Sequence, residues 1–163
     1  MVTKPPEARA EPGPEEVVRL MGTLHDFVGS ALHRLRPILG ENRVTMGQFL
    51  TLHVISSLQV ASVGAVARRL GISAPAASVS VDQLEEAGLV RRRRSERDAR
   101  TVELTVTARG HTVETRIWKE ATRVMGDTVR GLSVEDVTTA VHVFDRIARR
   151  LEPNGGAHWE GTR

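Results

Sequence analysis

The chain has 163 residues, of which 40% are hydrophobic and 26% charged, and this composition predicts a globular domain with its own core. No apolar run approaches the roughly 20 residues that cross a membrane, and no apolar leader stands at the start, so we expect a cytoplasmic protein with no membrane partner. The absence of cysteine excludes disulfides, thiolate metal sites and thiol-based oxidant sensing. The net charge is only +3 and aromatic residues make up 3%, which disfavours a stacking platform for single strands or RNA.

A long helix is the first predicted element. Residues 1–13 are rich in proline and are expected to form a disordered tail. From Glu15 onward, apolar residues recur at helical spacing and make one stripe, so we expect a helix over residues 15–40. A second helix is expected after Thr45, a suitable N-cap, with Phe49, Leu52 and Ile55 buried.

Two adjacent helices are expected next. Ser62 is a suitable N-cap for a short helix over residues 63–70, and Gly71 suits its C-terminal end. Ser73 is a suitable N-cap for a helix over residues 74–87, which Gly88 ends. A short helix, a glycine-containing turn and a second helix form a helix-turn-helix pattern, although many helical proteins contain one by chance.

A β-hairpin follows these helices. Leu89 and Val90 lead into one strand, apolar residues alternate in the returning strand over residues 101–106, and the sequence SERDA forms the tip. A hairpin after a helix-turn-helix predicts a winged helix, whose second helix can enter a major groove while the hairpin lies over phosphates or the minor groove. The arginine run 91–94, with Arg97 and Arg100, then has duplex DNA as its partner. The alternative is that these arginines form only a solvated surface.

Two further helices are expected before a loose tail at residues 152–163. Thr107 is the N-cap of a helix of roughly 24 residues, about 36 Å long by helical rise, which would end near residue 132. Ser133 and Asp136 resemble a capping box that opens the last helix. The expected fold class is therefore mainly α with a small β-hairpin wing, in which a winged helix-turn-helix core is flanked by N- and C-terminal helices.

The residues from Thr45 to Gly110 resemble the winged helix of the MarR (multiple antibiotic resistance regulator) family. The similarity rests on VARRLGIS before the second helix of the motif, VDQLEEAGLVRRR at its end, DAR at the wing tip and VTARG after the returning strand. The family's wing pattern is Asp-x-Arg, a strand, and then Leu-Thr-x-x-Gly, in which Val106 replaces the leucine here. With the flanking helices, the resemblance covers residues 15–151 and implies a homodimeric repressor that binds double-stranded DNA.

The resemblance assigns roles to the wing. Arg100 would reach the minor groove, and Asp98 would orient it, although Asp98 also suits a simple turn. Arg97 is a second candidate at the tip. Arg94, like the rest of the run, is expected to meet phosphates or acidic groups of the protein itself. Residues 45–107 would be the DNA-binding domain.

The second helix of the motif departs from the family's common pattern, because SAPAASVS stands where related sequences often carry arginine or another large polar residue. We expect Ala77, Val81 and Leu84 to face the core. The residues expected to face DNA, with Asp82 as a further candidate, are Ser73, Ala74, Pro75, Ser78 and Val79. Serine contacts base edges with little selectivity, and alanine and valine can contact only thymine methyl groups. We therefore expect few direct contacts to base edges. Specificity would depend on the wing arginines and on DNA shape, which favours an A/T-rich operator centre.

The helices over residues 15–40 and 108–151 have apolar faces that a compact winged helix does not need. The resemblance implies that these faces form a two-fold dimer, whose operator would be a pseudo-palindrome with half-sites about one helical turn apart. The expected interface residues are Val17, Leu20, Leu24, Val137, Val141, Phe144 and Leu151. The alternative is a helical bundle within one chain.

The resemblance also implies a small-molecule effector, often phenolic or otherwise aromatic, bound between the dimerisation helices and the winged helix. The candidate contacts are His25, His33, Met46, His53, His111 and Trp118. Each also has a plainer interpretation as a packing residue; His53, for example, suits a core or interface histidine.

No catalytic constellation stands out in the sequence. We find no phosphate-binding glycine-rich loop, no nucleophile elbow and no pair of histidines four residues apart on a helix. We therefore expect no enzyme, no cofactor and no metal, although histidine, aspartate and glutamate from distant segments leave a metal site open. The alternative functions are an architectural DNA-binding protein and a winged-helix module for protein contact without operator specificity.

Overall fold

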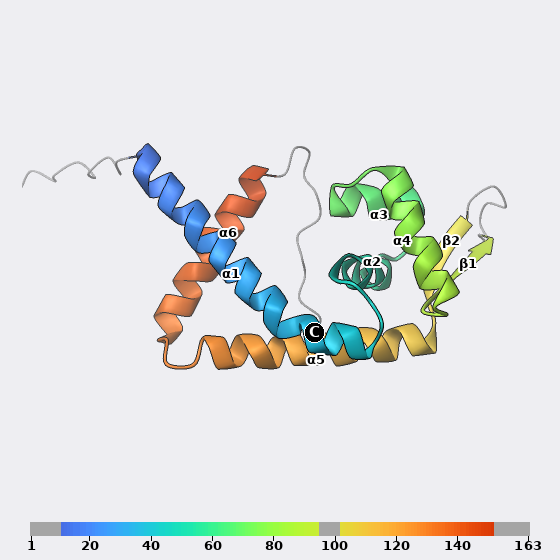
Figure 1. The fold of residues 1–163 in the computed structure, drawn as a ribbon. Coiled ribbons are helices and arrows are strands. Elements are labelled where there is room, and N and C mark those ends of the chain that lie inside the picture. Colours follow the sequence, from blue (N-terminus) through green and yellow to red (C-terminus); the bar gives the residue numbers. More distant parts are fainter. Residues whose placement is uncertain (1–10, 95–101, 152–163) are drawn as a thin grey trace, which may run out of the picture. The chain divides into compact units, whose positions relative to one another are not determined.

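The computed structural model describes residues 11–94 and 102–151 (Figure 1). Within that part the elements are α1 (Pro14–Glu41), α2 (Met46–Ser57), α3 (Val63–Leu70), α4 (Ala74–Glu86), β1 (Val90–Arg94), β2 (Val102–Val106), α5 (Ala108–Thr128) and α6 (Val134–Leu151). This is the predicted fold class, mainly α with a small β-hairpin. None of the described helices combines the length and the apolar character needed to cross a membrane. The chain divides into two compact units, one ending at Arg34 and the other beginning at Leu35.

The first unit contains most of α1. Pro14, whose fixed backbone angle suits the first turn of a helix, begins it one residue before the expected start. The apolar stripe predicted for this helix is exposed to solvent in the single chain, at Val17, Leu20, Leu24 and Phe27. The last turns of α1 belong to the second unit, where Leu39 is buried in the core.

The core of the second unit lies around α2, which contacts α3, α4, β2 and α5. Because α2 packs against so many elements, it is apolar over most of its surface, and Phe49, Leu52 and Ile55 are buried as predicted. Leu84 of α4 and Ile117 of α5 are also fully buried there. The winged-helix elements therefore share one core with the start of the long helix α5.

The predicted N-caps are confirmed. Thr45 and Gln48 form a reciprocal capping box, in which the Thr45 amide donates to Gln48 Oε1 at 2.7 Å and the Gln48 amide donates to Thr45 Oγ1 at 3.2 Å. The side chains of Ser62, Ser73 and Thr107 each accept a hydrogen bond from the amide three residues on. Ser133 and Asp136 form the second reciprocal box, at the start of α6.

The predicted end of α5 is wrong by about one turn. The helix has 21 residues and stops at Thr128, because the backbone turns at Gly131, whose φ of 94° lies in a region that favours glycine. The Leu132 amide closes this turn by donating to the Val129 carbonyl at 3.0 Å.

The hairpin is antiparallel, with Val90 opposite Val106, Arg92 opposite Leu104 and Arg94 opposite Val102. Ala61, between α2 and α3, forms a further bridge with Leu104, whose amide donates to the Ala61 carbonyl at 2.8 Å. The tip candidates Arg97, Asp98 and Arg100 lie outside the described residues. The base of the wing is thus joined to the core, and its tip stays a sequence-based prediction.

Candidate nucleic-acid interface

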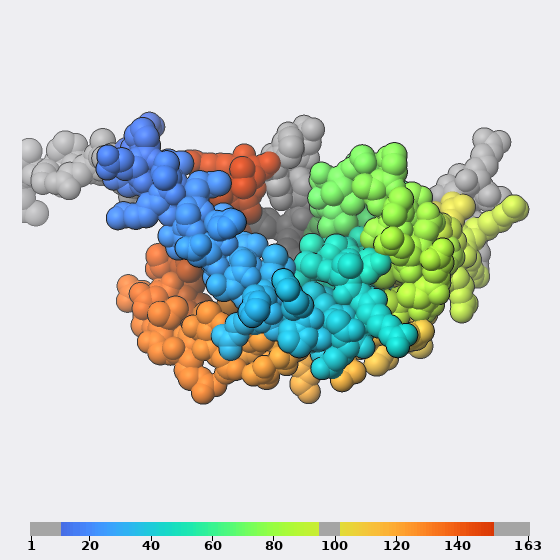
Figure 2. Space-filling view, in the orientation of Figure 1, coloured from blue at the N-terminus to red at the C-terminus, as the bar shows by residue number. Residues whose placement is uncertain are grey.

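Helix α4 presents one face to the core and the other to solvent. Ala77, Val81 and Leu84 are buried against the other helices, as expected from their spacing. The N-terminal turns expose Ala74, Pro75 and Val79 on the opposite side, and Ser78 is half-buried. Ser73 is exposed at the start of the helix, where its side chain serves as the cap. Figure 2 shows α4, in green, at the molecular surface close to the hairpin.

Polar side chains fix α4 on α2. The Ser80 hydroxyl donates to Thr51 Oγ1 at 2.9 Å, and the Thr51 hydroxyl donates to the Gly47 carbonyl at the same distance. The Gln83 side chain accepts a hydrogen bond from Gln48 Nε2 at 2.9 Å. Because Gln48 also belongs to the capping box of α2, the start of α2 and the middle of α4 are held together.

A second set of polar contacts joins α4 to β1. The Arg92 amide donates to Glu85 Oε1 at 2.9 Å, and the Arg92 guanidinium donates to the other Glu85 oxygen and to Asp82 Oδ1, the latter at 2.6 Å. The Arg92 backbone amide, together with its guanidinium, holds the pKa of the Glu85 carboxyl below its ordinary value of 4.5. The arginine run was expected to contact either DNA phosphates or acidic groups of the protein, and Arg92 contacts acidic groups of the protein.

Other arginines of the run keep their charge available. Arg91 and Arg94 are exposed, and neither forms an ion pair with any residue in the described ranges. In a strand, alternate side chains point to opposite faces, so Arg91 projects away from the face on which Arg92 meets α4. The hairpin thus separates one structural arginine from arginines that can meet an anion.

The junction of the wing and α5 is tightly packed. The Thr107 hydroxyl donates to the Gly88 carbonyl at 2.8 Å, and Arg109 Nη1 donates to the Ala87 carbonyl at 3.0 Å. A Cβ atom on Gly110 would lie 2.1 Å from the Leu89 carbonyl oxygen, so only glycine fits there. This contact explains physically why glycine ends the motif VTARG. The role of Arg109 is not predictable from the sequence, because its partner is a backbone group on another element.

Three of the effector candidates meet at one place between α2 and α5. The His53 ring stacks on Trp118 with 5.4 Å between the ring centroids and 2° between the ring planes. His53 Nδ1 lies 2.9 Å from Glu114 Oε1, and His111 Nδ1 lies 3.7 Å from Glu114 Oε2. Glu114, which is only 9% exposed, is not among the residues predicted from the sequence. Its position between the buried residues Val113 and Ile117 was the available signal, since a carboxylate on an apolar face needs a partner.

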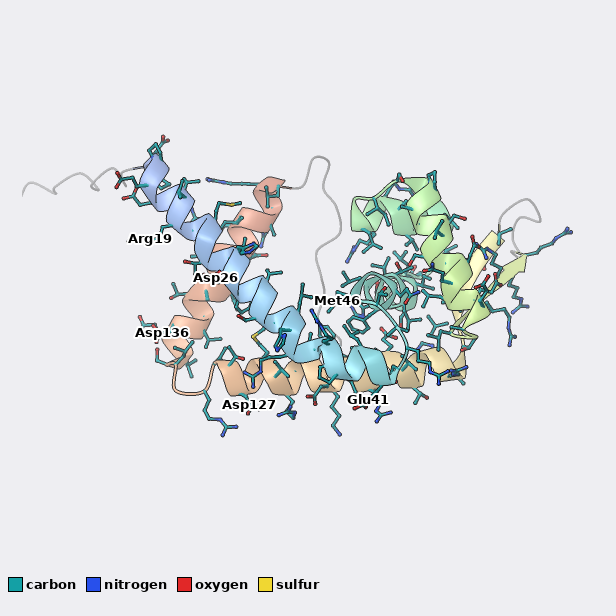
Figure 3. All side chains as sticks on the ribbon, in the orientation of Figure 1. Arg19, Asp26, Glu41, Met46, Asp127 and Asp136 are labelled. Carbon is teal, nitrogen blue, oxygen red and sulfur yellow. The ribbon has the colours of Figure 1, made fainter. Side chains whose placement is uncertain are left out.

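The remaining effector candidates are Met46, His25 and His33. Met46 is in the first turn of α2, where it packs against the core (Figure 3). His25 and His33 are exposed and belong to the first unit. Within the described ranges, no group of three or more histidine, aspartate or glutamate side chains could hold a metal ion.

The expected interface residues of α6 are largely open to solvent in the single chain. This helix has no buried residue, and Val141, Phe144 and Leu151 are all exposed, while Val137 is half-buried. Its apolar stripe therefore has no complete cover within the described chain.

Comparison with known proteins relates these features to one family. Residues 44–101 match the sequence profile of the MarR family. A MarR family protein from Bacillus stearothermophilus is similar over 86% of this chain and 96% of its own, with 23% identity and a TM-score of 0.70. The Staphylococcus aureus MarR, solved in complex with salicylate and kanamycin, is similar over 86% of this chain and 95% of its own, with 21% identity and a TM-score of 0.77. A MarR family transcriptional regulator from Rhodococcus sp. RHA1 is similar over 85% and 96%, with 18% identity and a TM-score of 0.68.

Proposed function

We propose that this chain is a MarR-family winged-helix transcription regulator that binds specific sequences in double-stranded DNA. The observation that carries the proposal is the exposed face of α4 beside a hairpin whose Arg91 and Arg94 have no acidic partner among the described residues. A helix in this position can enter the major groove while arginines on the wing contact phosphates. The related protein from Rhodococcus is itself described as a transcriptional regulator.

We propose that the active form is a homodimeric repressor. The exposed apolar residues of α1 and α6 would be buried between two copies, with residues 15–40 and 108–151 as dimerisation elements and residues 45–107 as the DNA-binding domain. Two-fold symmetry would place two α4 helices in successive major grooves of a pseudo-palindromic operator. In each wing, Arg97, Asp98 and Arg100 would form the tip, with Arg100 in the minor groove. A dimer bound over a promoter would block polymerase.

We also propose that an aromatic effector releases the operator. The cluster of His53, His111 and Trp118 around Glu114 supplies a flat ring, imidazole groups and a carboxylate in one place. Salicylate, a phenolic acid, is one of the compounds bound by the S. aureus relative in its solved complex. An effector can shift the protein only if it binds one arrangement of the DNA-binding lobes more tightly than the other.

Fluorescence anisotropy tests the proposal directly. The probes are the duplex upstream of the protein's own gene and a scrambled duplex, each at a low and a physiological salt concentration. A regulator binds the first duplex tightly at both concentrations. Equal, weak binding to both duplexes that is lost with salt would indicate an architectural protein, and no duplex binding at all would indicate a protein-interaction module.

Arg100→Ala examines the wing in the same assay. Loss of a minor-groove contact should weaken operator binding by about 1–3 kcal/mol while the dimer stays intact. Arg123→Ala is the control, because that exposed arginine on α5 already pairs with Glu120 and Asp127. If Arg100→Ala binds like the wild type, the role assigned to the wing tip is wrong.

A further inference from the structure

The exposed face of α4 is apolar where its N-terminal turns would meet base edges. Val79 is 54% exposed, and Ile72, just before the helix, is 40% exposed. Ala76 is also exposed, and it lies three positions before Val79 and therefore on the same side of α4. The face therefore offers mainly aliphatic carbon to a partner.

Apart from Glu86 and the half-buried Ser78, the polar side chains of α4 have partners within the chain. Ser80 is bonded to Thr51, Gln83 to Gln48 and Asp82 to Arg92. Ser73 uses its hydroxyl to cap the helix, by accepting from the Ala76 amide. The exposed carboxylate of Glu86 stands in the last turn, whereas a recognition helix contacts base edges through its N-terminal residues.

Only one base carries an apolar group on its major-groove edge, namely thymine with its C5-methyl group. We propose that Val79 is a specificity-determining residue that reads thymine methyl groups in the major groove, an inference that rests on the proposed function. The charges around α4 favour DNA over an apolar protein partner, since Arg91 and Arg94 extend from the adjoining hairpin without acidic partners among the described residues. Burial of a methyl group against Val79 distinguishes thymine from uracil, which differs only in lacking that methyl.

The test uses the full chain and a duplex obtained by repeated selection from a randomised DNA library. Thymines of the selected half-sites are replaced one at a time by deoxyuridine, and the Kd of each duplex is measured by fluorescence anisotropy. At a position read by Val79, the substitution should weaken wild-type binding about fourfold, the factor expected for one buried carbon.

Val79→Ala separates this contact from effects of uracil on the DNA itself. The variant should fold normally, because Val79 is exposed, and it should bind thymine and uracil duplexes with nearly equal Kd. Val60→Ala is the matched control: Val60 is 49% exposed in the segment between α2 and α3, and its loss should leave the discrimination at about fourfold.

The outcomes distinguish an error in the role of Val79 from an error in the proposed function. The role of Val79 would be overturned if binding is tight and sequence-specific but does not discriminate thymine from uracil, or if the discrimination survives in Val79→Ala. Either result would leave the proposed function as a regulator standing. If selection enriches no sequence, the proposed function itself fails.

Discussion

Glu85 binds Arg92 at two points, through the backbone amide at 2.9 Å and through the guanidinium, so the last turn of α4 and the first strand of the wing are held as one piece. The same guanidinium neutralises Asp82, a carboxylate on the helix that would approach DNA phosphates. Under the proposed function, Arg92 would therefore act on DNA binding through the position and charge of α4.

Arg92→Ala should weaken operator binding without changing its salt dependence. Removing this contact displaces the wing and leaves the carboxylates of Asp82 and Glu85 without their partner. It removes no phosphate contact, so DNA binding should still release the same number of counterions. Arg91→Ala, one residue away, should instead lower the slope of log Kd against log salt by about 1, as expected for one lost phosphate contact. Anisotropy titrations at four salt concentrations give both slopes, and an equal loss of slope in the two variants would show that Arg92 touches phosphate.

Acid should weaken the fold partly through Glu85. Its pKa is lowered in the folded chain, so its contribution to stability is complete above the ordinary value of 4.5 and is lost as the pH falls through the lower folded value. The free energy of unfolding should therefore fall less steeply below pH 4.5 in Glu85→Gln than in the wild type. Some slope will persist, because Glu120 and Asp136 also have lowered pKa values beside Arg123 and Ser133. Urea unfolding followed by circular dichroism from neutral to acid pH measures this, and parallel curves would contradict it.

Gly110→Ala should destabilise the chain by about 1–3 kcal/mol, the range for overpacking a close contact. The added Cβ would collide with the Leu89 carbonyl oxygen and with Val106, so the start of α5 would have to move away from the wing. Gly126→Ala is the control on the same helix. Nothing lies within 4 Å of a Cβ there, so this change should stabilise by about 0.5–1 kcal/mol. Equal effects of the two changes on thermal unfolding would refute the packing argument.

Phe144→Asp or Val141→Asp should convert a dimer into monomers, because each places a charge in the apolar stripe of α6. Tight operator binding should be lost with the dimer, since each half-site alone binds weakly. Thr139→Asp is the control, on the opposite side of the same helix. Light scattering after size-exclusion chromatography measures the mass, and a monomeric wild type would remove this prediction altogether.

Local chemistry made much of the fold predictable from sequence. Thr45, Ser62, Ser73 and Thr107 cap helices through bonds to amides three residues away, so the start of each helix is determined by its own neighbours. The end of α5 was not predictable in this way, because the apolar spacing continues past Thr128 into a turn that depends on the backbone at Gly131.

The partners within the candidate sites could not be predicted for a different reason. Glu85 and Arg92 lie on different elements, as do His53 and Glu114, and their pairing depends on how those elements pack. The sequence supports a charged wing and an aromatic cluster as hypotheses. It does not show which arginine is structural, nor that a buried carboxylate joins two histidines.

The packing of the wing ends at its third residue pair. Val90 and Leu104 are buried and Arg92 is anchored to Glu85, whereas Arg93, Arg94 and Val102 are exposed. Substitutions of the exposed residues Arg94 and Val102 should therefore leave the core and the seat of α4 as they are. Under the proposed function, a copy of the gene would therefore acquire new DNA contacts at these two positions without loss of thermal stability.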